Sequence, residues 1–190
     1  MILEKAIADK DFKKYSSLNL FFEDESRFGL FTRSGKAITA KGVKPVCPYL
    51  HRFENTYLFG AFSPVNGDSF MLDLPYCNTE MFQLYLDEFS KRKSKELKII
   101  LLDNGAFHKA KKLIVPDNIC LVFLPPYSPE LNAAEKVWWV LKKTIKLIAF
   151  QTLEKLQVKL HSEIKKLIRP SKIKRLTGYK YSLNAFQTII

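Results

Sequence analysis

The sequence predicts a mixed α/β fold in which a β-sheet with both parallel and antiparallel strands is flanked by helices. Short apolar runs typical of strands occupy residues 18–22, 56–62, 69–74, 97–102 and 119–124. The Asn66-Gly67 pair between two of these runs is a hairpin signal, and it predicts antiparallel pairing. A helical stretch separates later runs, and a helix that crosses between strands predicts parallel pairing.

Two of the predicted strands carry acids at their ends. The run over residues 18–22 is expected to end in the triplet Glu23-Asp24-Glu25, with residues 28–32 returning as a second strand. The run over residues 97–102 is apolar on both faces, which is typical of a central buried strand. It ends at Asp103.

Apolar stripes predict three helices, over residues 78–93, 132–149 and 153–168. Asn78 or Thr79 is placed to cap the first one. The segment 125–131 contains three prolines and is expected to lack regular structure, and Pro170 is expected to end the third helix. The remaining residues, 171–190, are predicted to form a basic patch followed by an aromatic tail.

The charge balance favours a polyanionic partner. Thirty-one Lys and Arg residues against nineteen Asp and Glu give a net charge of +12 in a chain of 190 residues. Binding to phosphates releases counterions, so an excess of this size is typical of nucleic-acid-binding domains. The lysine clusters lie at residues 33–46, 109–112, 142–146 and 165–175. Each cluster taken alone is also compatible with a solvated face.

The cysteines and the apolar runs predict the cellular compartment in which the protein is found. Cys47, Cys77 and Cys120 are odd in number and far apart, which argues against a disulfide framework or a zinc ribbon and favours buried free thiols in a reducing cytosol. The N-terminal residues lack the apolar core of a signal peptide. No uncharged stretch approaches the roughly 18 residues of a membrane span, so no membrane partner is expected.

Three acids are candidates for chemistry because of where they stand. Asp24 and Asp103 follow predicted strands, and Glu135 lies in the first turn of a predicted helix. Active sites of α/β sheets gather at such strand ends and helix starts. Adjacent carboxylates repel each other and need a cation to stay ionised, and hard divalent ions prefer carboxylate oxygen. Acids after strands are also common in turns, and Glu135 has the capping spacing from Asn132.

Three sequence blocks resemble the motifs of DDE transposases, in the bacterial insertion-sequence branch of the mariner-like superfamily. They are Phe22-Glu-Asp-Glu-Ser-Arg-Phe-Gly29, Leu101-Leu-Asp-Asn-Gly-Ala-Phe-His108 and Leu124-Pro-Pro-Tyr-Ser-Pro-Glu-Leu-Asn-Ala-Ala-Glu-Lys-Val-Trp138. The third block is the most specific, and Glu135 follows Asp103 by 32 positions, a compact interval of the kind this superfamily shows.

The resemblance implies a ribonuclease-H-like fold, a mixed five-stranded sheet with helices on both faces. It assigns Asp24, Asp103 and Glu135 to the catalytic triad, holding two divalent ions, Mg²⁺ or Mn²⁺. The implied reaction is metal-dependent hydrolysis at the transposon end of double-stranded DNA. The resulting 3′-hydroxyl then attacks target DNA, without a covalent protein–DNA intermediate.

Five further residues have supporting or DNA-contacting roles by position in these blocks. Glu25 and Asn104 neighbour the first two acids, and His108 is read either as a support or DNA contact or as a plain polar residue at a helix start. Tyr127 is a candidate for stacking on a base, although packing under the proline loop is the commoner fate. Asn132 is expected to cap the helix that presents Glu135, and Trp138 is expected in the core.

The resemblance also divides the chain and suggests partners. Residues 1–17 are interpreted as a linker or remnant, 18–150 as the catalytic domain and 151–190 as a C-terminal helix and tail. Related transposases carry N-terminal helix-turn-helix modules that this chain has no room for, so a separate helix-turn-helix protein or reading frame is one open partner. Joining two DNA ends suggests a homodimer, and a bacterial, cytoplasmic, nucleoid-associated location is expected.

Two other functions stay open at this point. One is a different ribonuclease-H-like nuclease that acts on RNA–DNA hybrids or junctions, which the third block disfavours. The other is a catalytically decayed fragment that binds only DNA or a partner transposase, which the presence of all three acids disfavours.

Overall fold

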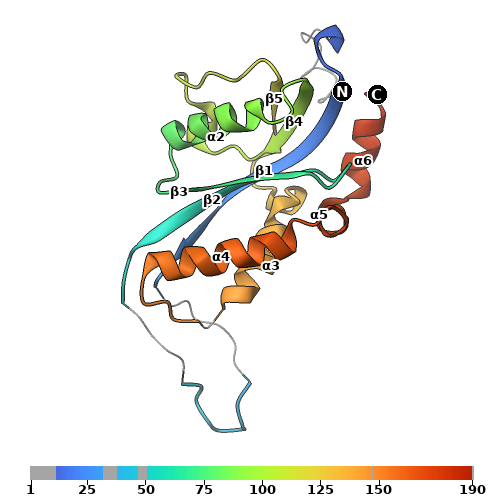
Figure 1. The fold of residues 1–190 in the computed structure, drawn as a ribbon. Helices are drawn as coiled ribbons and strands as arrows, with labels where there is room; N and C mark the ends of the chain where they lie inside the picture. The colour runs from blue at the N-terminus through green and yellow to red at the C-terminus, as the bar shows by residue number, and fades with distance from the viewer. Residues whose placement is uncertain (1–11, 32–37, 47–50, 147, 190) are drawn as a thin grey trace.

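The computed structural model describes residues 12–31, 38–46, 51–146 and 148–189 (Figure 1). Thr32, Cys47 and part of the expected linker and irregular segment lie outside the described residues. The elements in chain order are η1 Phe12–Lys14, β1 Ser17–Gly29, β2 Asn55–Phe62, β3 Ser69–Leu74, α2 Thr79–Lys91, β4 Glu96–Leu102, η2 Ala106–Lys109, β5 Ile119–Phe123, η3 Pro129–Leu131, α3 Ala134–Ile145, α4 Leu153–Leu167, α5 Pro170–Thr177 and α6 Lys180–Gln187.

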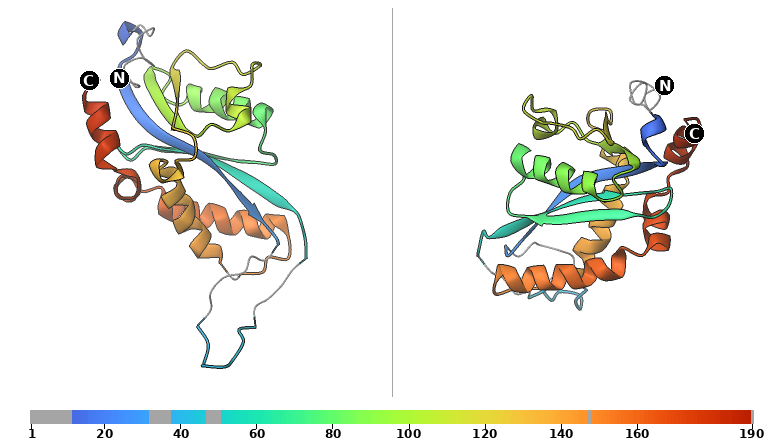
Figure 2. Two further views of the ribbon diagram at one scale, coloured as in Figure 1. Left: turned by 180° about the vertical axis from the view of Figure 1, so that it is seen from behind. Right: turned by 45° about the horizontal axis from the view of Figure 1, so that its top comes forward.

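The predicted mixed sheet is confirmed, with five strands in the order β3-β2-β1-β4-β5. β1 pairs antiparallel with β2 and parallel with β4, while β4 pairs parallel with β5. The hairpin between β2 and β3 turns at Gly67, whose φ of +79° is the left-handed conformation that glycine adopts without strain. Helix α2 covers one face of the sheet, and α3 and α4 cover the other (Figures 1 and 2).

The expectation of two strands separated by the acidic triplet is wrong. β1 runs unbroken from Ser17 to Gly29 and therefore passes through residues 23–25. The strand continues because it changes partner there. Its pairing with β4 ends at Phe22, and its pairing with β2 starts at the same residue and continues to Gly29. The ladder to β2 thus supplies the backbone hydrogen bonds that hold the acids in a strand.

The helices differ from the expectation mainly after residue 130. Asn78, one of the two predicted candidates, caps α2 by accepting a 2.9 Å hydrogen bond from the Met81 amide. Helix α3 is shorter than the expected span of 132–149, because Ala133 is its N-cap and Lys146, with ψ of 136°, ends it. The expected C-terminal tail forms the helices α5 and α6, and Pro170 begins α5 as its first residue.

Two apolar layers enclose the sheet. One layer, on the side of α3 and α4, contains Leu20, Phe22 and Phe28 of β1 together with the predicted core residue Trp138. The other, on the side of α2, contains Phe21 and the buried α2 residues Phe82, Tyr85, Leu86 and Phe89. Because strand side chains alternate, even-numbered residues of β1 face α3 and odd-numbered residues face α2.

Cys77 is a free thiol, and burial, followed by the charges of Glu25, Asp24 and Asp103, raises the pKa of Cys77 to about 11. Cys120 is buried and Cys77 is half-buried. Within the described ranges, every helix is too short or too polar to cross a bilayer.

Candidate active site

Asp24 and Asp103 come from the two central parallel strands. The last residue pair between β1 and β4 is Phe22 with Leu101, so each Asp lies two residues beyond it and the two are level. Asp24 lies inside β1, facing α3, whereas Asp103 directly follows the end of β4 and has a side chain that is 61% exposed. The two strands are neighbours and parallel, so both carboxylates lie at the same edge of the sheet.

Glu135 reaches the same place from the first turn of α3. This helix packs on the α3 side of the sheet through Val137, Trp138 and Leu141. The pKa of Asp24 is raised well above its ordinary value, first by burial and then by the charges of Glu25, Glu135 and Asp103, which outweigh a hydrogen bond from the backbone. The structure thus brings the three predicted acids into one electrostatic cluster.

Asn132 fixes the loop before α3 to the strand that carries Asp24. Its buried side chain donates a 2.8 Å hydrogen bond to the Glu23 carbonyl and accepts a 3.1 Å bond from the Ala134 amide. The second bond caps the first residue of α3 as expected, although the formal N-cap is Ala133. The loop is also held from the C-terminal side, because the Tyr181 hydroxyl donates to the Leu131 carbonyl.

Asn104 and Tyr127 border a cavity of about 440 Å³ between Asp103 and the proline loop. The Asn104 side chain donates to the Leu124 carbonyl and accepts from Lys109 Nζ, so it ties the end of β4 to that loop. Tyr127 is fully exposed and has a φ of +58°, so it does not pack under the loop. Its ring is open to an incoming ligand.

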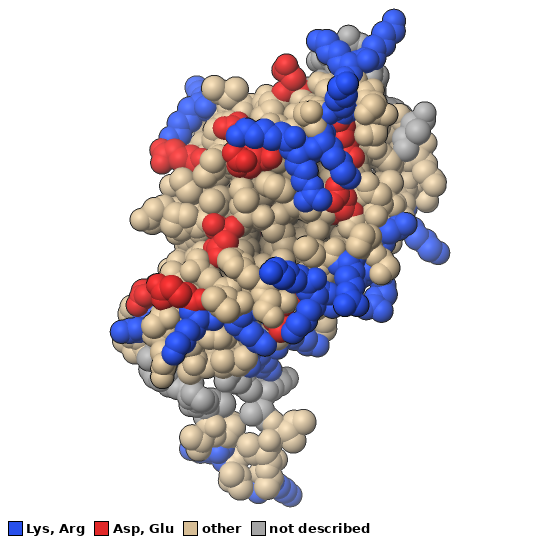
Figure 3. Space-filling model, in the orientation of Figure 1, with Lys and Arg blue, Asp and Glu red and all other residues tan. Residues whose placement is uncertain are grey.

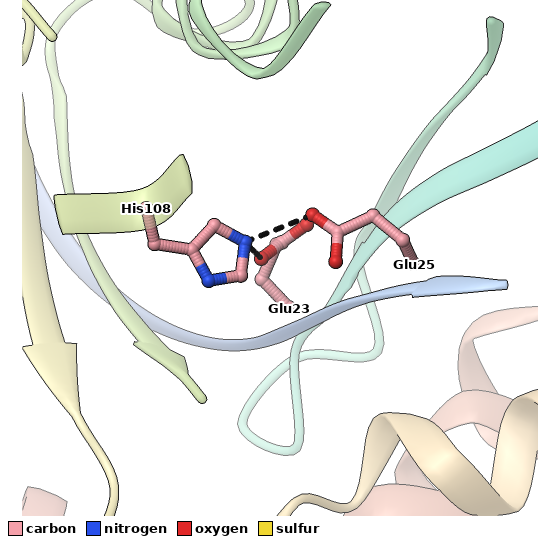
Figure 4. Close-up of side chains that lie close together, drawn as sticks. All are labelled: Glu23, Glu25 and His108. Carbon is pink, nitrogen blue, oxygen red and sulfur yellow. Dashed lines mark hydrogen bonds and ion pairs between the residues drawn. The ribbon is translucent and has the colours of Figure 1, made fainter. Parts of the chain in front are cut away.

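A second acidic group lies on the opposite face of β1 (Figure 4). His108 of η2 points at Glu23 and Glu25, and its Nε2 atom lies 3.0 Å from Glu25 Oε1 and 3.9 Å from Glu23 Oε2. His108 is 2% exposed, which leaves almost no surface for a DNA contact. One ligand atom from each of the three side chains lies within 4.8 Å of the others.

His108 connects this buried group to the exposed triad. Its Nδ1 atom lies 3.0 Å from Asp103 Oδ1, which also accepts a 2.8 Å hydrogen bond from the Gly105 amide. The imidazole therefore lies between the carboxylates of Glu25 and Asp103. Nδ1 has no hydrogen-bond partner among the described residues, so the ring limits the position of the Asp103 carboxylate by close contact and not by a hydrogen bond.

Glu23 is the functional candidate that the sequence reasoning missed. Its carboxylate is fully buried and meets no hydrogen-bond donor among the described residues. Burial, followed by the charges of Glu25, Asp24 and Asp103, raises its pKa well above the ordinary value. The alternation of acids at 23 and 25 around Asp24 was a usable signal, but it has meaning only if β1 continues through the triplet.

The triad has the chemistry of a site for a hard divalent cation. Asp24, Asp103 and Glu135 offer carboxylate oxygens only, and two of the three side chains are open to solvent. The pKa of Asp24 is raised first by burial and then by the negative charges around it, so both burial and repulsion oppose the ionised form of Asp24. A bound cation would remove that repulsion, which is what a site built for a metal requires.

The fold is that of known transposase structures. The Mos1 transposase paired-end complex with the left transposon end superposes with a TM-score of 0.65 at 16% identity, covering 93% of this chain and 55% of that one. The Mos1 mariner paired end complex with Mn gives the same values. At this identity the likeness shows the fold, which confirms the expected ribonuclease-H-like architecture.

Among curated proteins, an uncharacterized protein of Sinorhizobium fredii, y4pE/y4sA, is 47% identical over 83 residues, which are 43% of this chain and 62% of that protein. The chain therefore spans less than two thirds of the length of the relatives it matches. The family model described as DDE superfamily endonuclease matches residues 19–157, a stretch that holds Asp24, Asp103 and Glu135. Because this match covers well over half of the 190 residues, the chain belongs to the DDE superfamily endonucleases.

Proposed function

We propose that this chain is the catalytic part of a transposase, which cleaves DNA at the ends of an insertion sequence and joins those ends to target DNA. The observation that carries the proposal is the convergence of Asp24, Asp103 and Glu135, from three separate elements, at one end of the parallel strands. Family membership gives this convergence its chemical meaning.

Asp24, Asp103 and Glu135 would hold Mg²⁺ or Mn²⁺, and we propose two ions. Crystal structures of Mos1 complexes with Mn and with Mg exist for the same fold. Bound divalent ions would supply charge stabilisation to the attacking and leaving oxygens of an in-line displacement at phosphorus. Three carboxylates without nitrogen or sulfur ligands suit these hard ions.

The other residues of the site would position the triad. Asn132 anchors the loop before Glu135 to β1, and His108, held by Glu25, fixes the carboxylate of Asp103. Pro125, Pro126 and Pro129 reduce the freedom of the loop in the unbound state, so less entropy is lost when Glu135 engages a ligand. Asn104 would hold the end of β4 against this loop.

Double-stranded DNA is the proposed substrate. The net charge is +12, and Lys and Arg side chains gather around α4 and α5 on the face shown in Figure 3. We propose residues 18–150 as the catalytic domain, residues 1–17 as a linker and residues 151–190 as a C-terminal extension. A homodimer would bring two DNA ends together, and a separate helix-turn-helix protein would supply end recognition.

A cleavage and strand-transfer assay tests the proposal. The full chain would be incubated with Mn²⁺ and labelled duplexes taken from the DNA that flanks its coding region, next to a duplex of scrambled sequence and an RNA–DNA hybrid. We expect nicking of duplex DNA and joined products, both lost in Asp103→Asn. Cleavage of the hybrid alone would favour the other ribonuclease-H-like nuclease. DNA binding without any cleavage would favour the decayed DNA-binding fragment.

A further inference from the structure

One stripe of α3 runs from the triad onto an open surface. Trp139 and Lys142 follow Glu135 by four and seven positions, spacings that return to the same side of a helix, and Lys146, the residue that ends α3, follows it by eleven. At about 1.5 Å per residue, Trp139, Lys142 and Lys146 lie roughly 6, 10 and 16 Å along the helix axis from Glu135. All four side chains are exposed.

Strand β1 leaves the triad beside this stripe. Asp24 lies in the charge cluster with Glu135, and four residues further on Phe28 packs edge-on against Trp138, with ring centroids 6.5 Å apart. The second half of β1 and the whole of α3 therefore run side by side away from the triad. A cavity of about 330 Å³ opens between them at the far end.

The cavity combines an apolar floor with a basic rim. Phe28, Leu30 and Leu156 contribute apolar side chains to its lining, and Trp139 with Phe150 adds aromatic ones. Its basic lining residues are Arg27, Lys142, Lys143 and Lys146, and no acid is among the described residues that line it.

Trp139 is exposed despite its size. It is 60% accessible, in contrast to the neighbouring Trp138, which is 1% accessible and belongs to the core. Lys143 Nζ lies 3.5 Å from the centroid of its indole ring, so a cation already stands at the aromatic face. An exposed indole among lysines, one helical turn from a triad acid, fits a ligand that has both a flat ring and a negative charge.

We propose that this groove, formed by Arg27, Phe28, Trp139, Lys142, Lys143 and Lys146, holds an unpaired segment of the DNA strand next to the reacting phosphate. Trp139 stacks on an unpaired base, and the lysines contact the phosphates. The inference rests on the proposed function and adds where the strand lies. In a duplex one strand carries a phosphate about every 3.4 Å, so the stripe spans on the order of three to five nucleotides.

A protein segment would suit the groove less well. Its rim presents only positive charges, which match a phosphate backbone in every register, and its volume is enough for a base. Stacking platforms that alternate with basic side chains are typical of single-strand binding. The continuity with Glu135 also gives a nucleic acid a path from the cavity to the triad.

The test measures DNA binding without cleavage, using the full chain with Asp103→Asn as the parent. The probes are three labelled duplexes of equal length: one is blunt, one has a four-nucleotide unpaired 5′ end, and one has a four-nucleotide unpaired 3′ end. Trp139→Leu should weaken binding of the unpaired-end probes by about 5- to 150-fold, because base stacking contributes about 1–3 kcal/mol and each 1.4 kcal/mol is tenfold. Binding of the blunt probe should change less than twofold, and Trp139→Phe should restore most of the loss.

The charge component has its own readout. Lys142→Gln should reduce the slope of log affinity against log salt by about one, whereas Lys172→Gln on α5 should not alter the preference for the unpaired end. Thermal midpoints check that the variants are folded, which is expected because Trp139 and Lys142 are exposed.

Three results would overturn the inference. Trp139→Leu could bind the unpaired-end probes as the parent does, or it could lose all three probes equally. It could also lose only self-association in light scattering, which would assign the groove to a protein partner. If the parent binds no DNA at all, the proposed function fails as well, so the two failures are distinguishable.

Discussion

The two faces of β1 at residues 23–25 carry acids in opposite surroundings. On the α3 side, Asp24 meets Asp103 and Glu135, two acids that are open to solvent. On the α2 side, Glu23 and Glu25 lie against a buried histidine, and Glu23 has no donor among the described residues. Neighbouring residues of β1 therefore belong to two acidic groups on opposite faces, one open to solvent and the other buried.

The difference in access separates the roles that the two groups can have. A substrate phosphate can approach the triad, because Asp103 and Glu135 are exposed, but it cannot reach Glu23, which is fully buried. His108 joins the two faces by contacting both Glu25 and Asp103. We therefore expect substitutions on the α3 side to remove catalysis, and those on the α2 side to change metal affinity or stability.

The largest effect is expected from Asp24→Asn. The substitution replaces a negatively charged, metal-binding carboxylate on the α3 side with a neutral amide. Because bound metal ions lower the barrier of such reactions by several kcal/mol, the cleavage rate should fall by about a thousandfold or more. Plasmid nicking in Mn²⁺ measures it. Asparagine also removes the cost of burying a charge and the repulsion from neighbouring acids, which together raise the pKa of Asp24, so the thermal midpoint of the metal-free protein should not fall. Cleavage within tenfold of the unsubstituted chain would remove Asp24 from the triad.

An intermediate effect is expected from His108→Asn. Loss of the contact with Asp103 should raise the Mn²⁺ concentration for half-maximal cleavage by about 10- to 100-fold, as for other residues that orient metal ligands. The rate at saturating metal should change much less. His161→Asn is the matched control, because His161 contacts Asp73 on another part of the sheet. An unchanged Mn²⁺ requirement in His108→Asn would make the histidine a packing residue.

A smaller effect on both properties is expected from Asn132→Ala. It leaves the Glu23 carbonyl and the Ala134 amide without their partner, which should cost about 2 kcal/mol of the free energy of unfolding. Glu135 then loses its fixed position, and cleavage should fall by roughly tenfold at temperatures where the chain is folded. Denaturant unfolding measures the free energy of unfolding, and a plasmid nicking assay measures the cleavage rate. A stability loss with full activity would show that the anchor does not position Glu135.

The smallest effect is expected from Glu23→Gln, and its sign depends on pH. Because the folded-state pKa of Glu23 is raised above its ordinary value of 4.5, its contribution to stability is present at lower pH and is lost as pH rises through the folded pKa. Glutamine carries no such penalty. The variant should therefore be more stable than the unsubstituted chain at pH 7, and this gain should shrink as pH falls toward 4.5. A gain that is independent of pH would contradict the assignment.

Most of the fold was predictable because each strand carries its own local signal. The apolar runs, the Asn66-Gly67 turn and the Asn78 cap all depend on residues near one another, and the structure confirms each of them. The acidic triplet led to the wrong prediction that the strand ends at residues 23–25, because acids after a strand normally favour a turn. The pairing with β2 that overrides this preference comes from residues more than thirty positions away.

The acids of the triad were predictable from the sequence, but the contacts that hold them in position were not. The motif blocks identified Asp24, Asp103 and Glu135, and the structure brings them together. The bond from Asn132 to the Glu23 carbonyl and the contact of His108 with Glu25 each join residues more than 80 positions apart. No local pattern encodes such contacts. The exposed state of Tyr127 likewise follows from the three-dimensional path of the proline loop.

The most direct test is calorimetric titration of Mn²⁺ into the metal-free chain and two variants, one from each face of β1. We predict that the unsubstituted chain and Glu23→Gln bind Mn²⁺, whereas Asp24→Asn loses measurable binding. The buried group of Glu23, Glu25 and His108 offers the alternative location, since its ligand atoms lie within 4.8 Å of one another. Unchanged binding in Asp24→Asn together with loss in Glu23→Gln would place the ion on the α2 side and would contradict a metal site at Asp24, Asp103 and Glu135.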